Sequence, residues 1–205
     1  VRHDIEDVRA AEALQRFRNV MPDVLGAVEL LWDTPSVMSR FEETGHISEQ
    51  TCRELGLVGP AARACGLERD VRYDHASGIY ALTHIPVSTA SGGDVFSRAY
   101  VRWLEIQRAA SFAQEQIPNL PGGELSVPFT GAQPRRIAVS LVEGWRGEIC
   151  HTAISDGQGR LAAYKVVDPS FHNWMGLAMA LREQQISDFP LCNKSFNLSY
   201  CGHDL

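Results

Sequence analysis

Apolar residues recur at helical spacing over the first thirty residues of the chain. Between 3 and 32 they fall every three or four positions, and charged side chains fill most of the positions between them. This period predicts a long amphipathic helix or a helix pair, in which Pro22 is a candidate bend. Pro35 ends the pattern, and we expect a short helical continuation at 36–43.

A second long helix is predicted in the middle of the chain. Asp94 is a candidate N-cap for residues 95–117, where apolar and small residues occupy more than one face. Such a helix is typical of the centre of a fold. Shorter helices are expected at 49–55 and, after the stop signal Asp168-Pro-Ser, at 171–182.

The second half of the chain contains a predicted sheet. Asp156-Gly-Gln-Gly159 is a strong hairpin signal between two strand-like segments. The expected strands are 136–142, 148–155 and 161–167, and a further extended segment is expected at 79–87. Irregular structure is expected in the glycine-rich segment 56–66, the proline-rich connection 118–128 and most of the tail from 186.

Composition narrows the class of protein. The 205 residues are 44% hydrophobic and 21% charged, which suits one globular domain or one large piece of a bigger subunit. A formal charge of −6 gives no basic field, so nucleic acid is not an expected partner. No apolar run approaches the roughly 18 residues that cross a bilayer. The five cysteines form no Cys-x-x-Cys pair, and we expect them to be reduced and mostly buried.

The amphipathic pattern is already running at Val1, and no initiator methionine precedes it. We therefore interpret residues 1–205 as the C-terminal portion of a longer subunit whose N-terminal part is missing.

Arg146 and His151 are candidate proton-handling or acceptor-site residues. Arg146 lies in Glu143-Gly-Trp-Arg-Gly-Glu148 between two expected strands, where the glycines let the backbone bend towards a ligand. Arginine offers five donors and a permanent charge, and histidine titrates near neutral pH. The pair suits an anion, a quinone oxygen or a proton path. The alternative is that Arg146 pairs with a carboxylate and His151 is an ordinary strand histidine.

Two further segments combine arginines with carboxylates. Arg63, Asp70 and Arg72 follow one another around the glycine-rich loop, and this alternation predicts a buried ion network that guides protons or fixes the loop. Arg98, Arg102 and Glu105 share one stripe of the second long helix, where Arg102 and Glu105 are spaced as an i,i+3 pair.

Together these motifs resemble a known family. Segments 56–72, 92–105, 143–156 and 168–191 are similar to the large subunit of membrane-bound (group 4, hydrogenase-3/4-like) nickel–iron hydrogenases and to the related 49 kDa quinone-side subunit of respiratory complex I. The resemblance implies an α+β fold with long helices packed around a small antiparallel β-sheet. It also implies that Arg146 lies over the hydrogenase metal position, with His151 in the same neighbourhood.

The tail departs from the hydrogenase pattern. In those enzymes four thiolates hold the nickel, two of them from a Cys-x-x-Cys pair near the C-terminus. When the tail is aligned on Ser187-Asp-Phe-Pro-Leu191, Ser199 and Gly202 occupy the two cysteine positions. A hydroxyl and a glycine hydrogen do not replace soft thiolates, so no metal is expected in this chain.

The resemblance therefore implies a subunit of a membrane-associated hydrogenase- or complex I-like oxidoreductase without its own nickel–iron centre. It would serve electron transfer and proton coupling beside an iron–sulfur cluster in a small partner subunit, with quinone as a possible acceptor. It would sit peripherally on the cytoplasmic side of the inner membrane, with other arm subunits and proton-pumping membrane subunits as partners. The alternatives are a true nickel–iron hydrogenase large subunit of the formate hydrogenlyase type and a purely structural coupling subunit.

Overall fold

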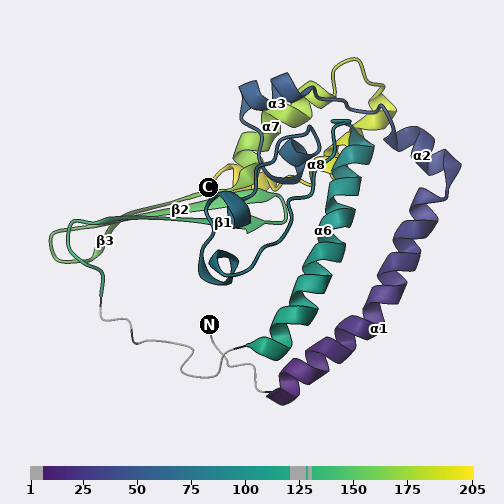
Figure 1. Ribbon diagram of the computed structural model, residues 1–205. Helices are drawn as coiled ribbons and strands as arrows, with labels where there is room; N and C mark the ends of the chain where they lie inside the picture. Colours follow the sequence, from purple (N-terminus) through teal and green to yellow (C-terminus); the bar gives the residue numbers. More distant parts are fainter. Residues whose placement is uncertain (1–6, 121–127, 129–130) are drawn as a thin grey trace.

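The computed structural model describes residues 7–120, 128 and 131–205 (Figure 1). The elements, in chain order, are α1 (Asp7–Trp32), α2 (Pro35–Phe41), α3 (Glu49–Leu55), α4 (Gly59–Arg63), α5 (Val71–Asp74), η1 (Gly78–Ala81), α6 (Val95–Gln116), η2 (Ile117–Asn119), β1 (Ile137–Gly144), β2 (Gly147–Ser155), β3 (Leu161–Val167), α7 (Pro169–Ala180), η3 (Ile186–Asp188), α8 (Phe189–Phe196) and α9 (Tyr200–His203). The expected α+β architecture, long helices with a small antiparallel sheet, is confirmed.

The two long helices lie next to each other (Figure 1). α1 is continuous through Pro22, and residues 1–6 of the expected helix lie outside the described part of the chain. α6 begins at the predicted cap, where the Asp94 carboxylate accepts a hydrogen bond of 2.8 Å from the Ser97 amide. α6 also contacts α4 and α8 and is therefore central, as its apolar pattern predicts.

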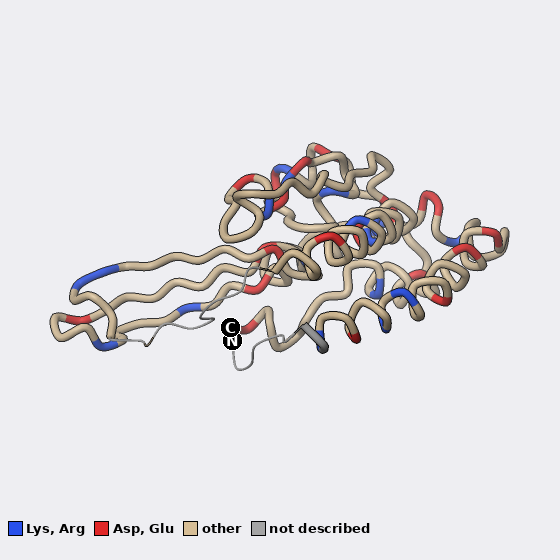
Figure 2. Tube along the Cα trace, turned by 60° about the horizontal axis from the view of Figure 1, so that its bottom comes forward, with Lys and Arg blue, Asp and Glu red and all other residues tan. Residues whose placement is uncertain are grey.

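The three predicted strands form one antiparallel sheet in the order β1-β2-β3. The β2–β3 hairpin closes at the predicted turn, where the Asp156 carboxylate accepts hydrogen bonds from the amides of Gln158 and Arg160. The strands run side by side away from the helices (Figures 1 and 2). The β1–β2 end of the sheet faces the helical body.

The core joins the short helices. Its buried residues come mainly from α3, α4, α7 and α8: Ile47, Cys52, Leu57, Ala61, Ala62, Cys65, Leu67, Val95, Leu177, Ala180, Cys192 and Phe196. All five cysteines are free, and three of them are buried, close to the expectation from the sequence.

Two expectations of irregular structure were wrong. The glycine-rich segment contains α4, and all five of its residues are buried, because small alanines and Pro60 pack closely in the core. The tail forms α8 and α9, since Cys192 and Phe196 anchor α8 in the core and Asn197 ends it in a left-handed conformation. The expected extended segment at 79–87 was also wrong: it begins with the helical turn η1 and forms no strand.

Two further segments differ from the predictions or lie partly outside the description. α7 begins two residues before the expected start because Pro169 suits the first helical turn. The connection at 118–128 begins with η2, and residues 121–127 lie outside the described part.

Candidate functional site

Five charged side chains form a buried ion network beneath the β1–β2 end of the sheet. At its centre is Arg63 of α4, whose side chain has no exposed surface. Its guanidinium nitrogens lie 2.6 Å from a Glu105 oxygen, 2.9 Å from a Glu143 oxygen and 3.5 Å from an Asp70 oxygen. Arg72 also contacts Asp70 and Glu105. The network therefore joins α4, α5, α6 and β1, and it contains three carboxylates and two guanidinium groups.

Two carboxylates of this network, Glu143 and Asp70, differ in their affinity for protons. Burial raises the pKa of Glu143, although Arg63 and a hydrogen bond from the Val71 amide oppose the effect. For Asp70, burial also favours the neutral form, but the hydrogen bond from Arg72 and the charge of Arg63 outweigh it, so its pKa is lowered. Glu143 is thus the member of this pair that takes up a proton more readily.

A second group of three arginines holds the tail. Arg98 donates to the Ser195 hydroxyl at 2.9 Å, and Arg102 donates to the carbonyls of Ser195 and Phe196 at 2.6 and 3.2 Å. Arg146 donates through Nε to the carbonyl of Asn197. These carbonyls end α8 and lack partners within the helix, so Arg102 and Arg146 satisfy them. The three tail-binding arginines together complement the negative end of the helix dipole.

Arg98 and Arg102 remain cations at neutral pH. Burial lowers the pKa of Arg98 and that of Arg102 to about 10, which is still well above neutrality. Neither has a carboxylate within ion-pair distance in the described part of the chain, so the expected Arg102–Glu105 pair does not form; Glu105 turns to Arg63 and Arg72 instead. This corner of the protein is positively charged.

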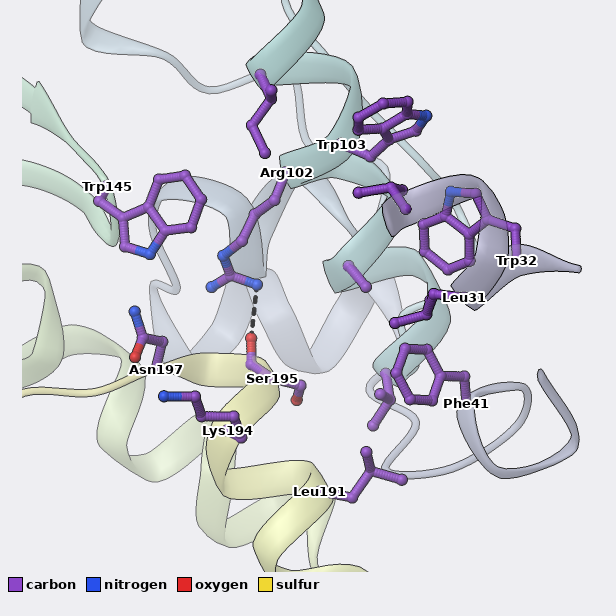
Figure 3. A pocket seen from close by; sticks show the side chains of 14 residues that line it. Leu31, Trp32, Phe41, Arg102, Trp103, Trp145, Leu191, Lys194, Ser195 and Asn197 are labelled. Atoms are coloured by element: carbon purple, nitrogen blue, oxygen red, sulfur yellow. Dashed lines mark hydrogen bonds between the residues drawn. The ribbon is translucent and has the colours of Figure 1, made fainter. Parts of the chain in front are cut away.

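An apolar cavity of about 470 Å³ opens beside Arg102, one of the tail-binding arginines (Figure 3). Its walls come from the end of α1, the middle of α6, α8 and the β1–β2 turn, and include Trp32, Trp103 and Trp145. Its lining carries two cationic side chains, Arg102 and Lys194, and no carboxylate. The Arg102 guanidinium lies between Trp145, 5.7 Å from the ring centroid, and the end of α8. The cavity suits an apolar molecule that carries electron-rich oxygen atoms.

Two buried nitrogen atoms of lining residues have no hydrogen-bond partner in the described part of the chain. They are Nε of Arg102 and Nε1 of Trp32. Buried donors are normally satisfied, so these two are candidate contacts for a bound acceptor or for water.

The turn that carries Arg146 is fixed by a close backbone crossing. Gly59 and Gly147 touch: a Cβ on Gly59 would lie 2.2 Å from the Gly147 Cα, and Gly59 has φ +64°. Asn173 of α7 adds hydrogen bonds to both backbone groups of Val58 and to the Arg146 carbonyl. The glycine at 147 therefore allows close packing against α4, which in turn sets the place of Arg146.

The structure does not bring His151 to Arg146. His151 is in the middle of β2, about 13 Å along the strand from Gly147 at 3.3 Å per residue. Its Nδ1 contacts the Tyr164 hydroxyl on β3, and it does not line the cavity.

The two tail positions that replace cysteine have local structural roles. The Ser199 hydroxyl accepts a hydrogen bond from the Gly202 amide at 2.9 Å and caps α9. A Cβ on Gly202 would lie 2.6 Å from Cγ of Asp168, whose carboxylate caps α7. In the described residues, no three His, Cys, Asp or Glu side chains gather as a metal-binding group.

Glu143 was missed as a site residue by sequence reasoning. Glu143 lies three positions before Arg146 in the same motif. A charged residue at the end of an expected strand was the signal that could have indicated it. It also lines an acidic hollow of about 380 Å³ that includes Glu68, Asp74, His75 and Glu148.

None of the described helices is long and apolar enough to span a membrane.

Comparisons with known proteins match almost the whole chain. A family profile described as "Respiratory-chain NADH dehydrogenase, 49 Kd subunit" matches residues 1–133 and 126–204. Formate hydrogenlyase subunit 5 of Escherichia coli is 30% identical over 204 residues, which are 100% of this chain and 36% of the relative. A subunit of the NADH-quinone oxidoreductase of Solibacter usitatus is 28% identical over 170 residues, 82% of this chain and 46% of the relative.

A solved structure shares the fold. A chain of the membrane-bound sulfane sulfur reductase, an archaeal respiratory membrane complex, superposes with a TM-score of 0.88 at 20% identity, covering 97% of this chain and 56% of that chain. This chain spans about a third to about half of the length of these three proteins. The resemblance inferred from the motifs is confirmed, and the chain belongs to the family of the 49 Kd subunit of respiratory-chain NADH dehydrogenase.

Proposed function

We propose that this chain is part of a subunit of a membrane-associated, hydrogenase- or complex I-like oxidoreductase and holds no nickel–iron centre of its own. The observation that carries the proposal is at Gly202. The place that a cysteine side chain would need is filled by the Asp168 carboxylate, and the Ser199 hydroxyl is engaged as a helix cap. The residues present therefore do not fit a nickel–iron site.

The proposed role is electron transfer and proton coupling beside an iron–sulfur cluster of a partner subunit. The acceptor, a quinone or another apolar molecule with carbonyl oxygens, would bind in the cavity between Trp145 and α6. Arg102 lines this cavity, and its buried Nε has no hydrogen-bond partner in the described part of the chain, so a small shift of the side chain would let it donate to such an oxygen. A cation at this place would also stabilise negative charge on a reduced acceptor.

Proton coupling is proposed for the ion network. Glu143 lines the acidic hollow and contacts Arg63, and its raised pKa favours uptake of a proton. Arg63 links it to Glu105 on α6, the helix that also carries Arg102. The chain thus offers one continuous set of ionic contacts between the hollow and the helix that lines the cavity.

The proposed cellular setting comes from the relatives. By name they are a formate hydrogenlyase subunit and an NADH-quinone oxidoreductase subunit, and the structural neighbour is part of a membrane complex. We propose the same setting for this chain: a peripheral position on the cytoplasmic face of the inner membrane, next to a small iron–sulfur subunit and proton-pumping membrane subunits.

A metal inventory of the native assembly tests the first part. The complete complex is purified through a tag on this chain, and nickel and iron per complex are measured by mass spectrometry. We expect iron from partner clusters and nickel well below one atom per chain. Stoichiometric nickel would overturn the proposal in favour of a true nickel–iron hydrogenase.

A matched set of variants tests the tail. Gly202→Cys should lower the stability of the chain, because the new side chain displaces the Asp168 cap. Adding Asp168→Ala should recover part of that loss. Equal stability of Gly202→Cys and the wild type would show that the tail has room for a thiolate, contrary to what the contact with Asp168 implies.

Turnover of the intact complex tests the cavity. Arg102→Met changes the cavity lining, and Arg146→Ala releases the Asn197 carbonyl in the tail beside the cavity. Each should lower the rate by tenfold or more while the complex still assembles, and Arg53→Met, an exposed change on α3, should leave the rate unchanged. Normal turnover of both site variants in assembled complexes would instead support a purely structural coupling subunit.

A further inference from the structure

The outer part of the sheet is largely exposed in the described part of the chain, apart from a contact between Lys165 of β3 and the carbonyl of Leu205. The contacts that tie the sheet to the helices lie at its β1–β2 end, where Glu143 meets α5, Gly147 meets α4 and Arg146 meets Asn173. Beyond that end, residues 137–140 of β1 and 161–165 of β3 are all exposed. We call residues 137–142, 149–155 and 161–166 the sheet arm.

One face of the sheet arm is largely apolar. Ile137 pairs with Ile154, and Ile154 pairs with Ala163, so these side chains form a row across all three strands. Val139 lies in the next row on the same face, where it pairs with Thr152 and Thr152 pairs with Lys165. Ile137 and Val139 are 65% and 61% exposed, and Ile154 is 42% exposed. A sheet normally packs at least one face against another layer, so a bare apolar face indicates a missing layer.

The charges around this face are mainly positive. Residues 131–142 and 149–167 carry a net charge of +3. Their cations are Arg135, Arg136, Arg160 and Lys165, and their one carboxylate is Asp156. The whole chain carries −6. In Figure 2, blue segments that mark Lys and Arg lie along the strands that extend from the helices. A surface that complements the sheet arm is therefore apolar at its centre and acidic at its border.

We propose that the sheet arm docks into another protein subunit of the same membrane-associated assembly, through an apolar surface bordered by acidic residues. The area of one face follows from the strand geometry. Three strands of five residues each, with about 3.4 Å per residue and about 4.8 Å between strands, present roughly 250 Å² per face. A stable pairwise interface needs about 800 Å² from each partner, so the sheet arm suits one part of a larger multi-subunit contact better than a dimer of this chain.

The same features argue against insertion into lipid. Within the described residues, the edge strands β1 and β3 pair with no further strand, and their outer backbone groups can pair with a protein strand but not with a hydrocarbon chain. This inference concerns an interaction surface and does not depend on the acceptor cavity or on the metal question.

Photo-crosslinking in the native complex tests the proposal. A photoreactive phenylalanine analogue replaces Val139 in the tagged chain, and the matched control carries it at Ile186, which is 96% exposed and far from the sheet in sequence. After irradiation, we expect Val139 to crosslink to one partner subunit, at a site with neighbouring Asp or Glu, with a yield at least fivefold above the control. Crosslinks to a second copy of this chain, to lipid or to nothing above the control would each overturn it.

A charge reversal supplies an independent readout. Arg135→Glu with Arg136→Glu should cause that partner to dissociate at a several-fold lower salt concentration, since surface charge pairs are screened by salt. The exposed change Arg53→Glu on α3 is the control. Equal salt resistance of the double variant and the control, with normal amounts of chain in the cells, would also overturn the proposal.

Discussion

Arg63→Met is the sharpest test of what holds this fold together. The substitution keeps a long side chain in the core and removes the cation that contacts Asp70, Glu105 and Glu143. Two of these carboxylates have side-chain exposures of only 3% and 4%, so water cannot replace the lost charge. We therefore expect a large loss of stability.

The size of the loss follows from the burial. Removing one partner of a buried ion pair costs about 3–5 kcal/mol, because the remaining charge is left uncompensated. For a chain of this length, each kcal/mol lowers the melting temperature by about 2–4 °C, which gives a fall of roughly 6–20 °C. Urea unfolding of the purified chain, followed by circular dichroism, measures the free energy of unfolding directly.

Arg53→Met is the matched control. Arg53 also pairs with a glutamate at 2.6 Å, but the two side chains are 59% and 55% exposed. Such surface pairs contribute about 0.2–1 kcal/mol, so the control should stay close to the wild type. If Arg63→Met also stays within about 1 kcal/mol of the wild type at neutral pH, the reasoning about uncompensated buried charge is refuted.

Two more predictions use the same assay. Asp70→Asn keeps a side chain that can cap α5 but removes its negative charge. The pKa of Asp70 in the folded chain is lowered below its ordinary value of 3.8. The ionised carboxylate therefore stabilises the fold above pH 3.8. The variant should therefore be less stable at neutral pH, and its difference from the wild type should shrink as the pH falls below 3.8, whereas a constant difference would contradict the assignment. Gly59→Ala should lower the free energy of unfolding by over about 2 kcal/mol more than Gly56→Ala does. Both glycines have φ near +65°, but only a Cβ at position 59 would meet the Gly147 backbone, at 2.2 Å. Equal losses would show that this crossing yields easily.

The sequence predicts the regular parts of this fold because their signals are local. The Asp94 cap, the Asp156 turn and the strand periodicity each depend on a few neighbouring residues, and each lies where the pattern indicates. α4 and α8 were missed for a different reason. Their helical form depends on burial of Pro60 and Phe196 against distant segments, which no local pattern reports.

The candidate site was predictable only in part for the same reason. The arginine and aspartate motifs did indicate a buried ion network, and Arg63, Asp70, Arg72 and Glu105 meet in it. The third carboxylate, Glu143, comes from a strand 80 residues away from Arg63 along the chain. The separation of His151 from Arg146 follows from the extended geometry of β2, once the turn before it is placed.

The double role of Arg102 has a thermodynamic consequence. The same guanidinium lines the cavity and holds the carbonyls that end α8. A molecule bound in the cavity that strengthens or weakens these hydrogen bonds must shift the equilibrium between the closed and the open C-terminal segment. By thermodynamic reciprocity, opening of the segment must change the affinity for the bound molecule by the same factor. Cavity and tail are thus two readouts of one equilibrium, and order in the tail reports on what the cavity holds.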